Sequence, residues 1–342
     1  MIRTFFSILL LPLTIWYAVA IVVRNLFYRT GIFKREKHEI PTICVGNLST
    51  GGTGKTPHTE YLIQLLCSQM NVAVLSRGYG RKTTGFILAD ESATALTIGD
   101  EPLQFYKKFK NITVAVCEKR NIGVKQLSKL QNPPNVIILD DAFQHKSIIP
   151  STSILLTEYA KPFYNDYILP YGNLREFRRA YKTADIIIIT KCPQSLTDLE
   201  KQRIIRKINH KPTQKVFFSA IKYGNPVPLN NSLFSDFENL LIVSGIANPK
   251  PLYDFLGKNY QITKMEFPDH HVYSKKDICN IRKQFDEISS SSKAIITTEK
   301  DTMRLRDIID IELFDSVPVF YLPIEIYFLD TEKQLDDIVG SL

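Results

Sequence analysis

The residues with the clearest chemical meaning form a glycine-rich loop between a predicted strand, residues 40–45, and a predicted helix. Backbone N–H groups in such a loop point inward and, together with the positive end of the helix dipole, bind phosphate. The lysine of such a loop reaches the β- and γ-phosphates of a nucleotide, and the hydroxyl group that follows it binds Mg²⁺. The loop therefore predicts a site for a nucleoside triphosphate and Mg²⁺, formed by Ser49, Thr50, Gly51, Gly52, Thr53, Gly54, Lys55 and Thr56.

This loop departs from the general phosphate-loop pattern at one position. The pattern G-x-x-x-x-G-K-[ST] begins with glycine, and this chain has Ser49 there. A flexible glycine turn without a ligand is the alternative interpretation. The β-branched strand before the loop favours the phosphate site, and so do Pro57 and the apolar residues at helical spacing after it.

An apolar strand that ends in two carboxylates forms the second motif. Residues 136–139 are all apolar, and Asp140 and Asp141 follow them directly. Carboxylates at such a strand end hold Mg²⁺, either directly or through water. A strand followed by an ordinary acidic turn is the alternative, but the upstream loop favours the metal role.

Further polar residues follow predicted strands or lie in predicted loops. Arg77 comes after the second strand, where it suits an anionic substrate, although a solvated basic loop is an equal alternative. Asp100 and Glu101 begin a helix, where acidic residues ordinarily act as caps. Residues 298–301 end a strand with charged groups, and a solvated strand end is the default expectation for them. The other candidates are His145, Arg175, Glu176, Asp269, His270 and His271.

The elements that must position these residues alternate between short β-branched runs and helical stretches. This pattern predicts an α/β fold with a doubly wound, mostly parallel sheet, in which ligands bind at the carboxyl ends of the strands. Prolines and a glycine in residues 211–231 indicate a hinge, after which a second, smaller α/β domain follows. We expect an N-terminal helix in residues 1–38, a nucleotide-binding domain in 39–215 and the smaller domain in 216–342. Whether the final segment returns to the first domain stays open.

The N-terminus is apolar, because residues 5–23 carry no charge. This length is close to that needed to cross a bilayer as a helix. Basic residues follow the run, which places the rest of the chain in the cytoplasm by the positive-inside rule. A helix that spans the membrane and a helix half-buried at its surface are equal alternatives. A cleaved signal peptide is a rival to both, because residues 18–20 resemble a cleavage site.

Composition and net charge indicate what class of molecule this protein binds. The chain has 342 residues, of which 44% are hydrophobic, and this favours a folded globular protein. The net charge of +8 suggests an anionic partner, and the basic cluster after the apolar run points to a membrane surface. No nucleic-acid-binding signature and no metal-binding cysteine pattern occurs in the sequence. We expect no nucleic acid and no obligate protein partner.

Taken in order, these motifs resemble the tetraacyldisaccharide 4'-kinase family, the lipid A 4'-kinases of Gram-negative bacteria. Ser49 is also what this family tends to have, so the departure from the general pattern supports the resemblance. The motifs that carry it are Gly46-Asn47-Leu48, Gly51-Gly52-Thr53-Gly54-Lys55-Thr56-Pro57, Ser76-Arg77-Gly78-Tyr79-Gly80, Gly99-Asp100-Glu101-Pro102, Asp140-Asp141-Ala142-Phe143-Gln144-His145, Leu174-Arg175-Glu176, Gly245-Ile246-Ala247-Asn248-Pro249, Asp269-His270 and Thr298-Glu299-Lys300-Asp301.

The resemblance implies transfer of the γ-phosphate of ATP to the 4'-hydroxyl of a tetraacyldisaccharide 1-phosphate lipid, at the cytoplasmic face of the bacterial inner membrane. It also implies that Asp100 is the catalytic base and that His270 pairs with it from the second domain. Lys55, Thr56, Asp140 and Asp141 keep the roles given above. Further contacts to substrate, metal or phosphate are expected from Arg77, Glu101, His145, Arg175 and Glu176.

Two other functions fit some of the same features. A membrane-associated P-loop ATPase that acts as a nucleotide switch on a protein partner would also have a phosphate loop and a basic, apolar tail. A cytosolic kinase of a small molecule would need no N-terminal helix. The destination of the γ-phosphate distinguishes the switch from a kinase.

Overall fold

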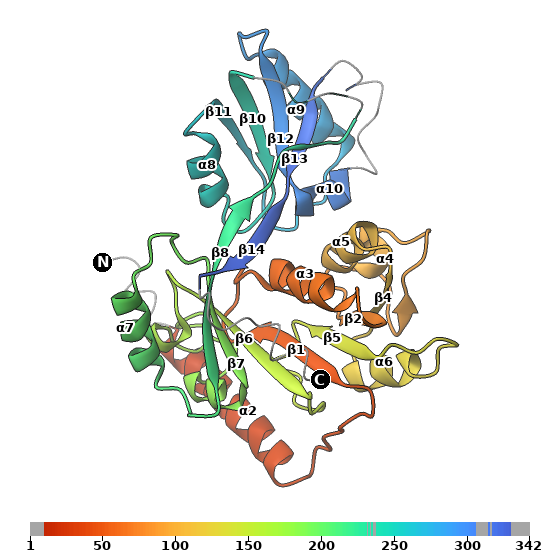
Figure 1. Ribbon diagram of the computed structural model, residues 1–342, viewed down its shortest axis with the longest axis vertical. Helices are drawn as coiled ribbons and strands as arrows, with labels where there is room; N and C mark the ends of the chain where they lie inside the picture. The colour runs from red at the N-terminus through yellow and green to blue at the C-terminus, as the bar shows by residue number, and fades with distance from the viewer. Residues whose placement is uncertain are drawn as a thin grey trace.

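Short β-branched runs form the strands of two sheets, each in its own domain (Figure 1). The computed structural model describes residues 10–230, 232, 234, 237–305, 314 and 317–329. The larger sheet has nine strands, in the order β14-β8-β7-β6-β1-β5-β2-β4-β3. Neighbouring strands are parallel except at the two edges, where β14 and β3 are antiparallel to their neighbours. The strands are β1 (Thr42–Asn47), β2 (Val72–Ser76), β3 (Ile87–Leu88), β4 (Ile112–Val116), β5 (Val136–Asp140), β6 (Thr152–Glu158), β7 (Ile186–Thr190), β8 (Lys215–Tyr223) and β14 (Ile324–Phe328).

Both faces of this sheet are covered, because its central strands are apolar on both sides. Val45 of β1 packs in one core cluster with Leu62 of helix α3, whereas its neighbour Cys44 packs with Leu127 of α6 in another. This arrangement confirms the predicted doubly wound α/β fold. The helices of the domain are α3 (Lys55–Leu66), α4 (Ala95–Ile98), α5 (Asp100–Lys108), α6 (Arg120–Leu127) and α7 (Asp198–Ile208).

The smaller domain has a five-stranded sheet in the order β11-β10-β12-β13-β9, parallel except for β9. Leu252 of α8 and Ile281 of α9 belong to two different core clusters, so this sheet too is packed on both faces. The elements are β9 (Val227–Pro228), β10 (Asn239–Ser244), α8 (Lys250–Leu256), β11 (Gln261–Glu266), α9 (Lys275–Asp286), β12 (Lys293–Thr298), α10 (Glu299–Leu305) and β13 (Val319–Leu322).

The chain passes between the domains twice, at positions that differ from the expected boundary. Residues 215–223, which we placed in the hinge, form β8 and pair with β7 of the larger sheet. Later the chain returns, because β14 pairs antiparallel with β8. The first crossing comes between β8 and β9, inside the predicted hinge of residues 211–231, so only the domain boundary at residues 215 and 216 was placed too early. Residues 330–342 lie outside the described residues.

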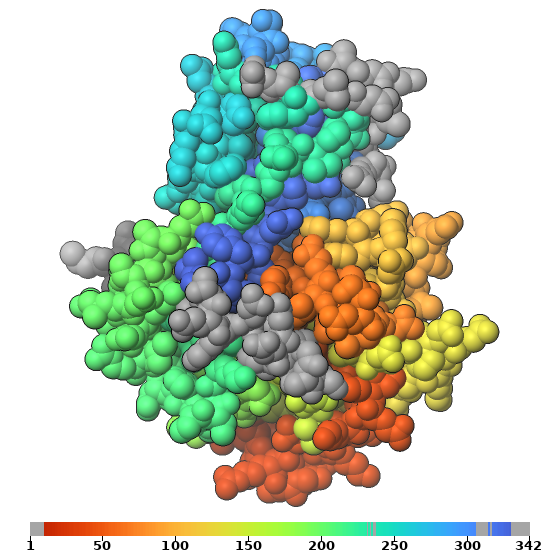
Figure 2. Space-filling view, viewed as in Figure 1, coloured from red at the N-terminus to blue at the C-terminus, as the bar shows by residue number. Residues whose placement is uncertain are grey.

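Helix α2 (Leu11–Arg29) corresponds to the apolar N-terminal run, of which residues 5–9 lie outside the described residues. It packs at the end of the larger domain away from the smaller domain (Figures 1 and 2). Among the described residues it is the one helix that is long and apolar enough to cross a membrane. Most of its apolar side chains are exposed, Trp16 most of all at 74%, whereas Ile21 is buried. This is the apolar N-terminal helix that we expected.

Candidate active site

The phosphate loop connects the end of β1 to the start of α3. Gly54, directly before the helix, has a φ of 88°, in the left-handed region that favours glycine. His58 fixes this helix start, because its Nδ1 lies 2.6 Å from the carbonyl oxygen of Gly54 and its Nε2 lies 2.9 Å from Oγ of Ser219 in β8. Burial lowers the pKa of His58 to about 4, so the ring is neutral at physiological pH. No sequence motif pointed to His58, and its contacts with Gly54 and Ser219 are seen only in the structure.

Asp140 and Asp141 end β5 beside the loop, as expected, but their surroundings differ. Asp140 is buried and accepts a hydrogen bond of 3.0 Å from Ser76 Oγ. Burial raises the pKa of Asp140 to about 7, and the charges of Glu101 and Asp141 add to the effect. A cation beside Asp140 would therefore be strongly favoured.

Asp141, in contrast, already has cationic partners. Its Oδ1 accepts a hydrogen bond of 2.8 Å from Arg175 Nη2, and its Oδ2 lies 3.8 Å from Lys55 Nζ. Burial alone would raise the pKa of Asp141, but the charge of Lys55 and the hydrogen bond from Arg175 lower it below its usual value. The two adjacent carboxylates are thus held in different charge environments.

Arg175 reaches this position because its segment runs along the phosphate loop. The N–H of Thr50 donates to the carbonyl of Asn173 at 2.8 Å, and the N–H of Arg175 donates to the carbonyl of Leu48 at 2.7 Å. The guanidinium group of Arg175 also donates to Oδ1 of Asn47. We define the phosphate site as residues 49–56 with Asp140, Asp141 and Arg175.

Glu176 lies on the other side of the same segment and faces helix α2. It is 1% exposed, forms an ion pair with Arg24 of that helix, and lies 3.4 Å from Lys146 Nζ. The hydroxyl of Tyr17 in α2 donates to the carbonyl of Arg175 at 3.1 Å. Glu176 therefore links the N-terminal helix to the segment that carries Arg175.

Three basic residues surround the edge of the sheet near the phosphate site. Burial lowers the pKa of His145 to about 4, and the charges of Arg120 and Arg77 lower it further. Arg77 is exposed. Arg120 is 1% exposed and donates to the carbonyl of Asp140 at 2.9 Å, which fixes the end of β5. Sequence reasoning missed Arg120, although its position just after β4 was a signal.

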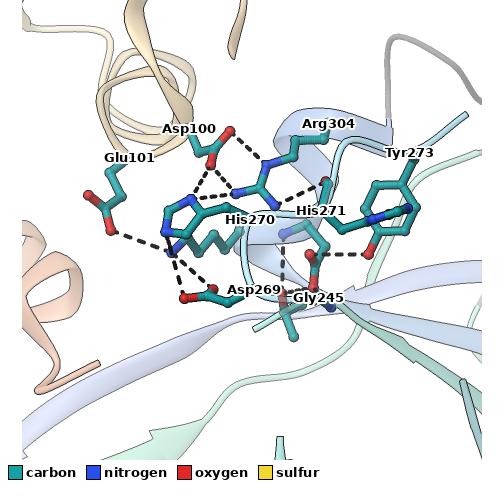
Figure 3. A network of polar contacts seen from close by, with 11 residues as sticks. Asp100, Glu101, Gly245, Asp269, His270, His271, Tyr273 and Arg304 are labelled. Carbon is teal, nitrogen blue, oxygen red and sulfur yellow. Dashed lines mark hydrogen bonds and ion pairs between the residues drawn. The ribbon is translucent and has the colours of Figure 1, made fainter. Parts of the chain in front are cut away.

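A second group of charged residues lies where the two domains meet (Figure 3). Asp100, the first residue of α5, is 8% exposed, and its Oδ2 lies 2.9 Å from Nδ1 of His270. Arg304 of α10 donates from Nε to Oδ1 of Asp100 at 2.7 Å, and its Nη2 donates to Oδ2. Burial alone would raise the pKa of Asp100, but the hydrogen bonds from His270 and Arg304 lower it to about 2.

Lys300 extends this group toward Glu101. Its Nζ lies 3.1 Å from Nε2 of His270, 3.5 Å from Oε1 of Glu101 and 3.9 Å from Oδ1 of Asp269. We call Asp100, Glu101, Asp269, His270, Lys300 and Arg304 the interdomain cluster. The charge of Glu101 helps to raise the pKa of Asp140, so this member of the cluster acts electrostatically on the phosphate site.

The expectation of a solvated strand end at residues 298–301 was wrong. Asp301 is fully buried, and its carboxylate accepts hydrogen bonds from the N–H of Gly245 at 3.0 Å and from the hydroxyl of Tyr273 at 3.2 Å. These contacts attach α10 to its own sheet and so position Lys300 and Arg304. Neither of these two residues was singled out as functional from the sequence.

A second ionic contact joins the domains at the other end of α5, where Lys108 is the last residue. Lys108 Nζ lies 2.9 Å from Oε2 of Glu60 in α3 and 3.0 Å from Oε1 of Glu299 in α10. Burial raises the pKa of Glu60 to about 7, because Lys108 is divided between two carboxylates and offsets the burial only in part. The smaller domain is thus held against α5 by two charged contacts.

The donor groups at the phosphate site fit a magnesium ion that shares its ligands with a nucleotide. Within the described part of the chain, no three His, Cys, Asp or Glu side chains converge as a complete metal site. Mg²⁺ commonly takes one or two protein oxygens and completes its shell with phosphates and water. Buried Asp140, with its raised pKa, and the Thr56 hydroxyl are oxygen donors of this kind.

Comparisons with known proteins agree on one family. Residues 6–342 match the family model described as Tetraacyldisaccharide-1-P 4'-kinase. The Tetraacyldisaccharide 4'-kinase of Bacteroides thetaiotaomicron is 42% identical and covers 95% of this chain and 90% of its own length. That of Flavobacterium psychrophilum is also 42% identical and covers 96% of this chain and 94% of its own length.

A solved structure gives the same answer for the fold. The crystal structure of Aquifex aeolicus LpxK in complex with ATP has a TM-score of 0.74 and 28% sequence identity, and it covers 100% of this chain and 99% of that protein. The family resemblance seen in the motifs is therefore confirmed over the whole chain. This chain belongs to the tetraacyldisaccharide 4'-kinase family and is an ATP-dependent kinase of lipid A biosynthesis.

Proposed function

We propose that the interdomain cluster and the phosphate site together transfer the γ-phosphate of ATP to the 4'-hydroxyl of a tetraacyldisaccharide 1-phosphate at the cytoplasmic face of the inner membrane. The observation that carries the assignment of residues is the contact of 2.9 Å between Asp100 and His270, which lie 170 positions apart in the sequence and come from different domains. The charge of Glu101, the residue after Asp100, adds to the raised pKa of Asp140, and this supports the proposal that the two sites act together.

At the phosphate site, residues 49–54 bind the phosphates through their backbone N–H groups, and Lys55 offsets the charge on the β- and γ-phosphates. Thr56 and Asp140 would hold Mg²⁺, which supplies positive charge to the phosphate oxygens. Asp141 keeps Lys55 and Arg175 in place, since both cations contact its carboxylate. Because these cations contact both of its oxygens, Asp141 would support Mg²⁺ through water.

In the interdomain cluster, Asp100 accepts the proton of the 4'-hydroxyl as the oxygen bonds to the γ-phosphorus and the bond to the β-phosphate oxygen breaks. ADP is the leaving group. Because phosphoryl transfer has a loose transition state, the hydroxyl loses its proton late and a weakly basic carboxylate is sufficient. His270 orients Asp100 through the hydrogen bond from Nδ1, and Lys300 contacts the other ring nitrogen.

Helix α2 brings this site to the membrane. Trp16 and Ile15 are 74% and 62% exposed, as expected for side chains that enter lipid and not the core. Arg24 pairs with Glu176, whereas Arg29, Lys34, Arg35 and Lys37 follow the apolar run and suit the anionic head groups of a cytoplasmic leaflet. An acceptor with four acyl chains could then present its sugar head group without leaving the bilayer.

The direct test follows the label from γ-³²P-ATP in mixed micelles that contain a tetraacyldisaccharide 1-phosphate. We expect label in the lipid, and none when the acceptor is a matched 4'-deoxy disaccharide. Label that appears only in free phosphate, at the same rate with both acceptors, would support a nucleotide switch and reject the transfer. Transfer to the 4'-deoxy acceptor would reject the assigned hydroxyl.

A further inference from the structure

Arg304 belongs to the interdomain cluster, but the proposed function gives it no role, either in phosphate binding or in the pair of Asp100 and His270. It lies in α10 of the smaller domain and is 7% exposed, with its guanidinium group directed across the domain boundary (Figure 3). Nε and Nη2 contact the two carboxylate oxygens of Asp100, 204 positions earlier in the sequence. Nη2 also lies 3.0 Å from Nδ1 of His270, and Nη1 lies 3.3 Å from the carbonyl oxygen of His271.

The geometry of this contact restricts the carboxylate more than a single hydrogen bond would. A planar guanidinium group that donates to both oxygens sets the plane of the carboxylate as well as its position. The remaining lone pairs of Asp100 are available to His270 and to one further donor. Asp100 is therefore held in one orientation by a group that belongs to the other domain.

Hydrogen bonds within the smaller domain hold Arg304 in this position. Its neighbour Asp301 is anchored by Gly245, Tyr273 and Thr298 within the smaller domain. The hydrogen bond from Arg304 to His271 also ties it to the loop that carries His270. The guanidinium group, His270 and Lys300 therefore all belong to the smaller domain and contact one another within it.

We propose that Arg304 is a positioning residue: from the smaller domain it sets the orientation of the Asp100 carboxylate, so that Asp100 serves as a base only while the two domains are in contact. This inference rests on the proposed role of Asp100. It adds a physical link between domain closure and proton transfer, since separating the domains withdraws both partners of the base at once.

The experiment compares Arg304→Ala with Arg282→Ala in the lipid-phosphorylation assay. Arg282 is the matched control, because it lies in α9 of the same domain and forms an ion pair with Asp286 within its own helix. We expect Arg304→Ala to lower kcat by about 100-fold, as expected for a misplaced catalytic group, with the KM for ATP nearly unchanged. Arg282→Ala should leave both constants at their wild-type values.

Chemical rescue separates positioning from a purely structural role. Methylguanidinium at low, non-denaturing concentration should restore part of the lost kcat of Arg304→Ala in a saturable manner and should have no such effect on the wild type or on Arg282→Ala. The double variant Arg304→Ala/Asp100→Asn should not be rescued. Rescue of that double variant, or absence of rescue in Arg304→Ala, would overturn the inference.

Two further measurements keep the test decisive. If Arg304→Ala does not fold, Arg304→Lys replaces it; lysine cannot reproduce the two-point contact, so wild-type kcat in that variant would overturn the proposal. The single variant Asp100→Asn is measured in parallel. Full turnover there would reject the base role itself, whereas an inactive Asp100→Asn with an active Arg304→Ala would reject only the inference about Arg304.

Discussion

The phosphate site and the interdomain cluster are assembled in different ways. The phosphate site takes its continuous loop and its two carboxylates from the ends of the neighbouring strands β1 and β5, and Arg175 from a loop of the same domain. The interdomain cluster joins Asp100 to His270 and Arg304, which lie 170 and 204 positions away in another domain. The first site therefore exists in one domain by itself, and the second exists only when two domains meet.

The two regions consequently depend on different supports. Helix α2 contacts the segment of the phosphate site that carries Arg175, through Tyr17 and Arg24. Helix α10 supports the interdomain cluster, through Arg304 next to Asp100 and Glu299 next to Lys108. We expect changes at the phosphate site to alter nucleotide binding, and changes in the interdomain cluster to alter turnover.

The largest expected effect comes from changing Asp100, the proposed base. Asp100→Asn should lower kcat by roughly 10²- to 10⁴-fold, because a general base contributes about that much, while the Kd for ATP stays close to the wild-type value. Lys55→Met is the matched change at the phosphate site and should raise the Kd for ATP as well as lower kcat. Rapid-quench kinetics and calorimetric titration of ATP measure the two constants. Equal losses of ATP affinity in both variants would contradict the distinction between a nucleotide-binding phosphate site and an interdomain cluster that acts on turnover.

The second effect concerns the pH dependence of stability at the other contact between the domains. The pKa of Glu60 is about 7 in the folded protein against 4.5 without perturbation, so folding favours its protonated form. Its contribution to stability is therefore present below about pH 4.5 and is lost as the pH rises through about 7. Glu60→Gln cannot ionise, so it should lack this loss, which amounts to at most roughly 3 kcal/mol.

Urea unfolding of both proteins at pH 5, 6 and 7 measures this difference. We expect the stability of Glu60→Gln relative to wild type to increase at each step in pH. A constant difference across this range would show that Glu60 titrates at its ordinary pKa.

The smallest effect tests the support of the phosphate site by α2. Arg24→Gln removes one cation from buried Glu176, but Lys146 remains 3.4 Å away and continues to offset the charge. We expect a loss of about 1–3 kcal/mol in the free energy of unfolding, as for a buried charged group that loses part of its hydrogen bonding. Arg29→Gln, an exposed residue on the same helix, is the control and should change stability by less than about 0.5 kcal/mol. Equal losses in the two variants would argue against a specific link through Glu176.

Much of the fold could be predicted because its signals are local. The β-branched runs at 72–76, 186–190 and 319–322 form the strands β2, β7 and β13. Strand β8 was missed because prolines before and after it suggested a hinge, and its pairing with β7 and β14 is a long-range contact. The same limit applies to Asp301. Its hydrogen-bond partners come from distant segments, so the local sequence did not show that this charged strand end is buried.

By itself, the sequence determined the family, the fold class and the phosphate loop, because glycines, a lysine and strand-end carboxylates at short spacing act through local backbone geometry. Only the tertiary structure decided that Asp140 and Asp141 have opposite pKa shifts, that Glu176 faces the N-terminal helix, and that Arg304 contacts Asp100. Each of these depends on burial and on charges brought together from separate elements. No spacing along the chain encodes such contacts, since they arise only when the sheets have packed and the two domains have met.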